Sequence, residues 1–146
     1  MCGIVGYVGP RPCRDLLLAG LESLEYRGYD SAGLSLLDAS GAVESVRAVG
    51  NLANLRAAVD QALESEAEGG AVATRTALSD ASTGIAHTRW ATHGRVTEEN
   101  THPHFDCNGQ IQIVLNGIVE NHAQLRRELA DEGHSFSSET DAEVVA

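Results

Sequence analysis

The stretch that most constrains the fold is a run of small and apolar residues at the extreme N-terminus. Its residues are Gly3-Ile4-Val5-Gly6-Tyr7-Val8, an alternation that is typical of a buried β-strand. Cys2 lies directly before this run, and an initiator methionine is readily trimmed when a small residue follows it. We therefore expect a strand that holds a terminal cysteine, with its thiol and a free α-amino group, inside the fold.

A cysteine in that position combines a nucleophile with its own base. A terminal α-amine titrates at roughly 7.7–8.0 and a free thiol near ~8.5, so the two groups exchange a proton readily at neutral pH. This is the N-terminal form of the logic by which a base activates a serine or cysteine nucleophile. The alternative is that Cys2 stands at the second position incidentally, and this feature alone leaves both interpretations open.

Length and composition limit the classes of protein to be considered. A chain of 146 residues with 42% hydrophobic content fits one soluble globular domain. The net charge of −11 argues against nucleic acids and anionic membranes as partners, because both attract basic patches. No run approaches the roughly 20 apolar residues of a membrane span. The odd number of widely spaced cysteines, Cys2, Cys13 and Cys107, favours a reducing cytoplasm over a disulfide framework.

Hydrophobic periodicity and turn residues predict an α+β chain. Asn51 is expected to cap a helix, and Gly133 to end one. The stretch 65–83 lacks periodicity and is expected to be a surface excursion. The predicted helices cover 13–26, 51–64 and 121–132, and the predicted strands 3–8, 32–37, 43–49, 84–88 and 111–115.

The C-terminal residues predict one further helix. Thr140 and Glu143 have the spacing of a capping box, which would start that helix near Asp141. No capping residue follows Val144-Val145-Ala146 to end it. We therefore expect the chain to be the N-terminal part of something longer.

Three positions supply what acyl transfer to a thiol requires beyond the nucleophile. Asn116-Gly117 offers a side-chain amide and a backbone N–H as oxyanion donors, although Asn-Gly is also a common turn dipeptide. Arg89 is suited to gripping a carboxylate, or to a surface ion pair. Asp141 is suited to binding an ammonium group, or to capping a helix.

A metal site is the competing hypothesis for the histidine-rich part of the chain. His102, His104 and Cys107 lie close in sequence, with His87 or His93 as a fourth ligand. Their spacing matches no common zinc signature, and we predict no metal. The glycines at 3, 6 and 9 do not form a dinucleotide fingerprint, and no Walker-type phosphate loop occurs, so we predict no cofactor.

Several longer motifs resemble one family, the class II (N-terminal nucleophile) glutamine amidotransferases. Within it, the chain is most similar to the glutamine–fructose-6-phosphate aminotransferases (isomerizing), also called glucosamine-6-phosphate synthases. The resemblance covers nearly the whole chain apart from 65–83, which is longer than expected. It rests on Met-Cys-Gly-Ile-Val-Gly at 1–6, Leu-Glu-Tyr-Arg-Gly-Tyr-Asp-Ser-Ala-Gly at 24–33, His-Thr-Arg-Trp-Ala-Thr-His-Gly at 87–94, His-Pro-His at 102–104, Asn-Gly-Ile-Val-Glu-Asn at 116–121 and Ser-Glu-Thr-Asp at 138–141.

The resemblance implies a role for each candidate residue. Cys2 would attack the side-chain amide of L-glutamine, with Asn116 and Gly117 as oxyanion donors. Arg89 would bind the α-carboxylate of glutamine and Asp141 its α-ammonium group. The remaining implied assignments are Thr92 and His93 in the pocket wall, Trp90 near the exit for ammonia, and 27–31 as a lid-like loop.

The resemblance also implies a four-layer αββα sandwich, incomplete at its C-terminal side. The ammonia would serve glucosamine 6-phosphate synthesis from fructose 6-phosphate, which sugar isomerase domains absent from these residues would bind. The full-length enzyme would be a cytoplasmic homo-oligomer. One departure is Leu115, where the resemblance leads us to expect histidine. The alternatives are another class II enzyme, such as amidophosphoribosyltransferase or asparagine synthetase, and a non-catalytic glutamine-binding fragment.

Overall fold

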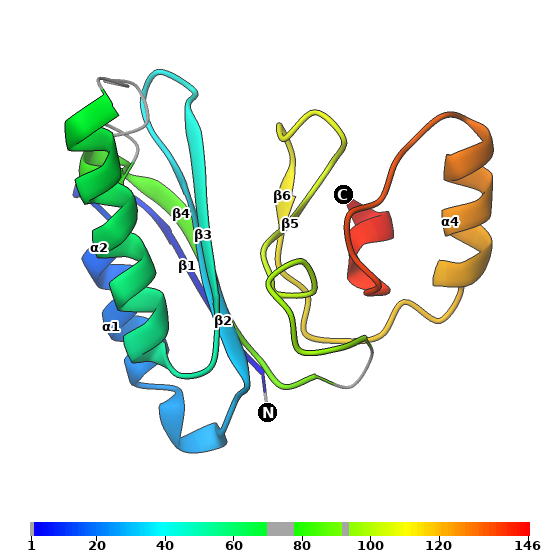
Figure 1. Cartoon of the computed structure of the whole chain (residues 1–146), viewed down its shortest axis with the longest axis horizontal. Coiled ribbons are helices and arrows are strands. Elements are labelled where there is room, and N and C mark those ends of the chain that lie inside the picture. Colours follow the sequence, from blue (N-terminus) through cyan, green and yellow to red (C-terminus); the bar gives the residue numbers. More distant parts are fainter. Residues whose placement is uncertain (1, 70–77, 92–93) are drawn as a thin grey trace.

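The computed structural model describes residues 2–69, 78–91 and 94–146. Figure 1 shows two sheets side by side, with helices covering the outer face of the first and lying beyond the second. This order of layers is the αββα arrangement that the resemblance implies. The elements are β1 (Gly3–Val8), α1 (Arg14–Glu22), η1 (Glu25–Arg27), β2 (Ser31–Leu37), β3 (Val43–Val49), α2 (Leu52–Gly69), β4 (Thr83–Arg89), β5 (His104–Phe105), β6 (Gln112–Ile113), α4 (His122–Asp131) and η2 (Ala142–Val145).

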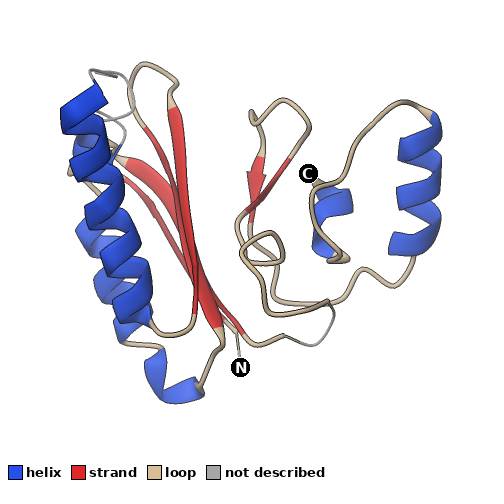
Figure 2. Ribbon diagram, viewed as in Figure 1, coloured by secondary structure: helices blue, strands red, loops and turns tan. Residues whose placement is uncertain are grey.

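The first sheet is antiparallel and has the strand order β1-β4-β2-β3. Figure 2 draws its strands in red, with blue helices along one face. β4 lies inside it, between β1 and β2, and most of its residues are buried. The register pairs Gly3 with Thr88, so the start of β1 lies against the end of β4. This pairing brings Cys2 next to Trp90, although 88 positions separate them along the chain.

The main core lies between this sheet and the two helices that cover it. α1 and α2 present apolar stripes to the sheet, as their three- and four-residue spacing of leucines predicts. On the other face, the sheet packs closely against the second layer, because a Cβ at Gly33 would collide with the backbone oxygen of His102. The fully buried apolar side chains include Leu17, Leu21, Leu34, Leu36, Leu55 and Val59.

Most predicted elements are confirmed, with changes at their ends. The strand at Gly3–Val8 forms, but the prediction that it is buried is wrong, because β1 lies at the edge of the first sheet and Ile4 and Val8 are 45% and 83% exposed. Asn51 caps α2, since its side-chain oxygen accepts the backbone N–H of Asn54 at 3.2 Å. Gly133 follows α4 with a φ of 99°, as expected of a residue that ends a helix. The predicted helix 13–26 is wrong at its C-terminal end, because α1 ends at Glu22 and a separate 3₁₀ turn follows at Glu25–Arg27. The strand predicted at 111–115 is only Gln112–Ile113, and its partner β5 was not predicted.

Two further predictions are wrong, one for the stretch 65–83 and one for the start of the last helix. The surface excursion at 65–83 begins as a continuation of α2 to Gly69, and Leu78 and Ala81 at its other end are buried in the core. Residues 70–77 lie outside the description. The capping box at Thr140 and Glu143 does not form, because both side chains bind other partners and the helix there is a 3₁₀ turn. None of the described helices is long and apolar enough to cross a bilayer.

The burial of Leu78 predicts a cost for truncating it. Leu78 is fully buried in the same cluster as Leu17 and Leu55. Leu78→Ala is expected to lower the free energy of unfolding by about 2–5 kcal/mol, because it removes buried methyl groups and leaves a cavity. Urea unfolding measures this change, and Ser79→Ala at the exposed neighbouring position is the matched control. Equal stability of the two variants would contradict the packing of Leu78.

Candidate active site

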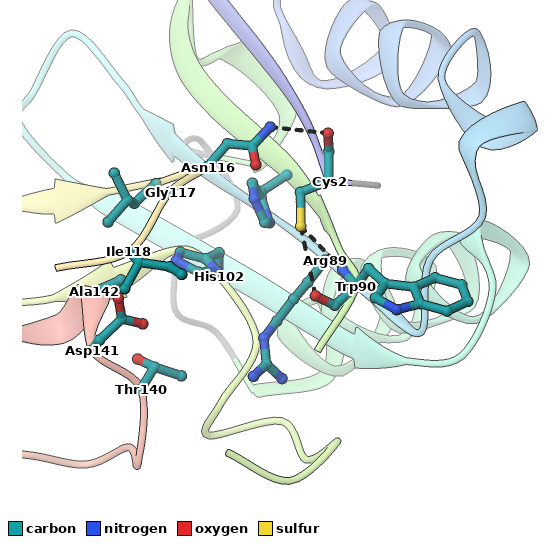
Figure 3. Close-up of a pocket in the computed structure, with 12 residues that line it drawn as sticks. Cys2, Arg89, Trp90, His102, Asn116, Gly117, Ile118, Thr140, Asp141 and Ala142 are labelled. Carbon is teal, nitrogen blue, oxygen red and sulfur yellow. Dashed lines mark hydrogen bonds between the residues drawn. The ribbon is translucent and has the colours of Figure 1, made fainter. Parts of the chain in front are cut away.

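A cavity of about 190 Å³ opens where β1 and β4 meet the second layer of the fold. Its walls come from five places in the sequence: the N-terminus, the end of β4, His102 in the segment before β5, the segment after β6 and the start of η2. Figure 3 shows Cys2 and Trp90 on one side and Asp141 on the opposite side. Six of the predicted site residues line this cavity: Cys2, Arg89, Trp90, Asn116, Gly117 and Asp141.

The thiol of Cys2 is held by the backbone at the end of β4. The N–H of Trp90 donates to Cys2 Sγ at 3.2 Å, and the Trp90 carbonyl lies 3.7 Å from the same sulfur. Directly behind, the N–H of Gly3 donates to Thr88 Oγ1 at 3.0 Å. The sequence did not predict this contact, which depends on the β1–β4 register.

Asn116 and Gly117 lie on the cavity wall rather than in a hairpin turn. The turn between β5 and β6 instead contains the other Asn-Gly pair, where Gly109 has a φ of 68°. Asn116 Nδ2 donates to the carbonyl oxygen of Cys2 at 3.1 Å. An amide nitrogen carries two hydrogens, so this bond leaves a second one for another acceptor. The turn interpretation of Asn116-Gly117 is therefore wrong.

Arg89 is buried, with 4% of its surface exposed, although arginine is rarely found inside proteins. Its Nη1 donates to the carbonyl oxygen of Arg95 at 3.2 Å. The burial contradicts the alternative of a surface ion pair. A buried guanidinium on a cavity wall provides a planar donor for an anion such as a carboxylate.

Asp141 provides the opposite charge in the same cavity and is 7% exposed. Its Oδ2 accepts the backbone N–H of Val119 at 2.7 Å, a bond between two segments of the second layer. It makes no capping hydrogen bond to η2, so the alternative of a helix cap is wrong. The cavity thus holds a buried cation and a buried anion in addition to the thiol.

Trp90 and the loop before β2 form the outer edge of the site. The indole is 53% exposed and lies over Gly28, where a Cβ would come within 3.2 Å of the ring. Asp30 fixes this loop to the end of β4: its N–H donates to the Arg89 carbonyl at 2.8 Å, and its carboxylate accepts the N–H of Ala91. This positioning role of Asp30 was not predicted. Thr92 and His93, the other predicted pocket residues, lie outside the described residues.

Three histidines are packed together at the cavity, and two of them, His87 and His102, line its wall. Each of His87, His102 and His104 is at most 6% exposed. The centroid of the His102 ring lies 4.3 Å from that of His87 and 4.4 Å from that of His104. Burial, followed by neighbouring cationic groups, lowers the pKa of His87 to about 4 and that of His102 to about 2. Burial likewise lowers the pKa of His104 to about 4. All three are therefore neutral at pH 7, and Arg89 supplies the positive charge of this cavity.

The zinc ligand set considered from the sequence does not form. Cys107 is exposed and contacts His134 Nδ1 at 3.5 Å, so it does not join His102 and His104. Within the described ranges, no three histidine, cysteine or acidic side chains are arranged to hold a metal ion. Of the ligand set considered, His87, His102 and His104 come together, and their rings pack at tilted angles of 48° and 59°.

Sequence comparison relates the chain to proteins that act on glutamine. The model of the glutamine amidotransferase domain family matches residues 47–146. A glutamine–fructose-6-phosphate aminotransferase (isomerizing) from Mycolicibacterium smegmatis is 50% identical over 145 residues, which are 99% of this chain and 22% of that protein. The one from Streptomyces coelicolor is 51% identical over 146 residues, covering 100% of this chain and 21% of that protein. The chain thus spans about a fifth of the length of these relatives.

Structure comparison supports the predicted fold. A glutamine phosphoribosylpyrophosphate (PRPP) amidotransferase from B. subtilis, complexed with ADP and GMP, has a TM-score of 0.67 and 23% identity. The match covers 99% of this chain and 28% of that chain. An allosteric regulatory enzyme of purine biosynthesis has a TM-score of 0.70 and 21% identity, and its match also covers 99% of this chain and 28% of that chain. The αββα fold class is therefore confirmed. Since the family model covers more than half of the sequence, the chain belongs to the glutamine amidotransferase domain family.

Proposed function

We propose that residues 1–146 are the N-terminal portion of the glutaminase domain of a glutamine–fructose-6-phosphate aminotransferase. The observation that carries this proposal is one cavity with a thiol, a buried cation and a buried anion, in a chain about half identical to such enzymes. The domain hydrolyses the side-chain amide of L-glutamine to glutamate and ammonia. The ammonia is used for glucosamine 6-phosphate synthesis from fructose 6-phosphate, which the sugar isomerase domains of the full-length enzyme bind.

The reaction begins when Met1 has been removed from Cys2. The free α-amine takes the thiol proton, and the sulfur attacks the amide carbon of glutamine to form a C–S bond and a tetrahedral oxyanion. The oxyanion accepts hydrogen bonds from Asn116 Nδ2 and the Gly117 N–H. The C–N bond then breaks, and the amine passes its proton to the departing ammonia. Water then adds to the carbonyl carbon of the γ-glutamyl thioester while the α-amine takes its proton. The C–S bond breaks, glutamate leaves, and the amine passes that proton to the sulfur.

Recognition of the fixed charges of glutamine separates it from other amides. Arg89 binds the α-carboxylate and Asp141 the α-ammonium group, so the side-chain amide is directed toward Cys2. The neutral histidines support this division of charge, because a protonated cluster would repel the ammonium group. The resemblance to the family assigns Thr92 and His93, which lie outside the described residues, to substrate binding. It also assigns Trp90 to the gate through which ammonia leaves and 27–31 to the lid. The low exposure of Arg89 and Asp141 makes their charges effective, since buried charges are screened little by solvent.

Two alternatives differ from this assignment in identifiable ways. Amidophosphoribosyltransferase or asparagine synthetase would share the fold, but similarity at 21–23% identity concerns the fold alone, whereas identity near 50% favours the aminotransferase. A non-catalytic glutamine-binding fragment would keep the charged groups and lack a reactive Cys2. We infer a cytoplasmic location and a homo-oligomer for the full-length enzyme, with no nucleic acid or membrane partner. The three free cysteines and the acidic net charge support the location and the partners.

Covalent labelling tests the proposed function directly. A chloroketone analogue of glutamine is expected to add once to the full-length enzyme, on a Cys2 that has lost Met1, and L-glutamine should protect against the reaction. Intact mass and peptide mapping identify the labelled cysteine. Cys107 is the competing thiol, because the Ser135 N–H and His134 lower its pKa and it is exposed. Cys107→Ser is therefore the matched control, and it should label as fully as the wild type.

Two results would contradict the function. Absence of any adduct on Cys2 would favour the non-catalytic fragment. An adduct confined to Cys107, or to the buried Cys13, would show that the thiol reactivity does not belong to the proposed site.

A further inference from the structure

A buried carboxylate lies behind the cavity without lining it. Glu143, in η2, is 5% exposed. Its Oε1 accepts the N–H of Ser137 at 2.7 Å and the Ser137 hydroxyl at 2.8 Å. Its Oε2 accepts the N–H of Ser138 at 2.8 Å and the Ser138 hydroxyl at 2.7 Å. Four donors from two adjacent residues thus converge on one carboxylate.

Arg126, in α4, holds the same segment through its carbonyl groups. Its Nη1 donates to the Ser138 carbonyl at 3.0 Å and its Nη2 to the Thr140 carbonyl at 2.9 Å. The guanidinium also lies 4.4 Å from the centroid of the Phe136 ring and 3.6 Å from Glu143 Oε2. The segment 137–140 belongs to no helix or strand. Arg126 binds two of its carbonyl groups, and Glu143 binds its N–H and hydroxyl donors.

The segment held in this way leads directly into the cavity. Thr140 Oγ1 lies 2.8 Å from His104 Nε2 and 3.0 Å from the Ser138 hydroxyl, so the buried histidines are joined to Glu143 through two hydroxyl groups. Asp141 is the next residue and projects into the cavity. Its Oδ2 also accepts the Val119 N–H at 2.7 Å. The direction of the Asp141 carboxylate is thus set by the backbone that Glu143 and Arg126 fix.

Glu143 is ionised in this setting. Burial alone would raise the pKa of Glu143, but the hydrogen bonds from Ser138 and Ser137 hold it below its usual value. A charged acceptor makes stronger hydrogen bonds than a neutral one, so it holds the segment more firmly than an amide would.

We propose that Glu143 is a positioning residue for ammonium recognition, acting through 137–141 to hold the Asp141 carboxylate toward the substrate. This inference rests on the proposed function. It distinguishes Glu143 from Asp141, which touches the substrate. It also predicts that loss of the Glu143 charge affects ligands with an α-ammonium group and spares those without one.

The test compares two inhibitors of the full-length enzyme, L-glutamate and glutarate, which lacks the α-ammonium group. In Glu143→Gln, one of the two carboxylate oxygens is replaced by an NH₂ group. This group cannot accept the N–H and the hydroxyl of the serine that it faces, Ser137 or Ser138. The inhibition constant of glutamate and the KM of glutamine are expected to rise at least about tenfold. The inhibition constant of glutarate is expected to stay within about twofold of the wild-type value. The kcat falls less than the KM rises, because Cys2 and the oxyanion donors are unchanged.

Two further variants make the outcome decisive. Glu128→Gln replaces an exposed glutamate on α4 that contacts Gln124, and it should leave every constant unchanged. Ser138→Ala removes the hydroxyl that bonds both Glu143 and Thr140. It should raise the inhibition constant of glutamate by a smaller factor than Glu143→Gln does. This variant decides the question if Glu143→Gln does not fold.

The results separate failure of the inference from failure of the proposed function. Equal weakening of glutamate and glutarate, or no change in either, would overturn the positioning role while wild-type glutamine hydrolysis persists. A wild-type enzyme without glutamine hydrolysis would instead overturn the function itself.

Discussion

Glutamine hydrolysis by the full-length enzyme is expected to fall to background when Cys2 is replaced by alanine. The loss should be on the order of 10⁶ in kcat, the scale seen when the nucleophile of a covalent hydrolase is removed. The reason is that, in the proposed mechanism, the other groups in the cavity bind or polarise glutamine but do not attack it; these groups are Arg89, Asp141, Asn116 and Gly117. Glutamate release, followed over hours, measures the residual rate.

The same variant should keep its fold. In the described structure the hydrogen bonds of Cys2 Sγ go to the backbone of Trp90, and Cys2 is half-buried, so truncation removes no fully buried side chain. The unfolding midpoint is therefore expected to stay close to that of the wild type, and L-glutamate should still bind. Cys107→Ser is the matched cysteine control and should retain full turnover. Glutamine turnover by Cys2→Ala at more than about a hundredth of the wild-type rate would refute the mechanism, since binding groups alone do not account for such a rate.

The α-amine can be separated from the thiol in the same experiment. A form that retains Met1 has an amide nitrogen on Cys2, and an amide does not accept the thiol proton. This form should be as inactive as Cys2→Ala while its thiol is still present. Mass spectrometry of each preparation shows which form was assayed.

Local patterns predicted the elements well where local forces decide them. The strand at Gly3–Val8, the hairpin of β2 and β3 and the Asn51 cap all follow from alternation, turn residues or a single side chain. The αββα order of layers followed from the resemblance to a family. The pairing of β1 with β4 could not be predicted from the residues alone, because alternation predicts a strand but not the strand with which it pairs.

The failures share one cause, which is a tertiary partner that replaces a local one. Thr140 and Glu143 have capping-box spacing, yet His104 takes the first side chain and Ser137 and Ser138 take the second. In the same way, Leu78 stands in a stretch without periodicity and is nevertheless fully buried. The contact of the Trp90 N–H with Cys2 also depends on register.

Replacing Asn116 with alanine is expected to lower kcat for glutamine hydrolysis by about 10²–10³ with little change in KM. In the structure, one hydrogen of the Asn116 amide goes to the Cys2 carbonyl, and the amide lies on the wall of the cavity. The second hydrogen is free to meet the oxygen of the tetrahedral intermediate. Because the oxyanion carries more charge than the glutamine carbonyl, the loss falls on the transition state rather than on substrate binding. Asn108→Ala, at an exposed asparagine in the β5–β6 turn, is the matched control.

Asn116 also holds the residue that carries the thiol, so the two effects must be told apart. Iodoacetamide alkylates a thiolate by direct displacement at carbon and forms no oxyanion. If Asn116 acts as an oxyanion donor, Asn116→Ala should alkylate at Cys2 nearly as fast as the wild type while its hydrolysis is slow. If alkylation slows in parallel with hydrolysis, the Asn116 bond to the Cys2 carbonyl serves to place the sulfur, and Gly117 becomes the principal donor. Hydrolysis within about tenfold of the wild type would exclude both roles, because either one places Asn116 on the path to the intermediate.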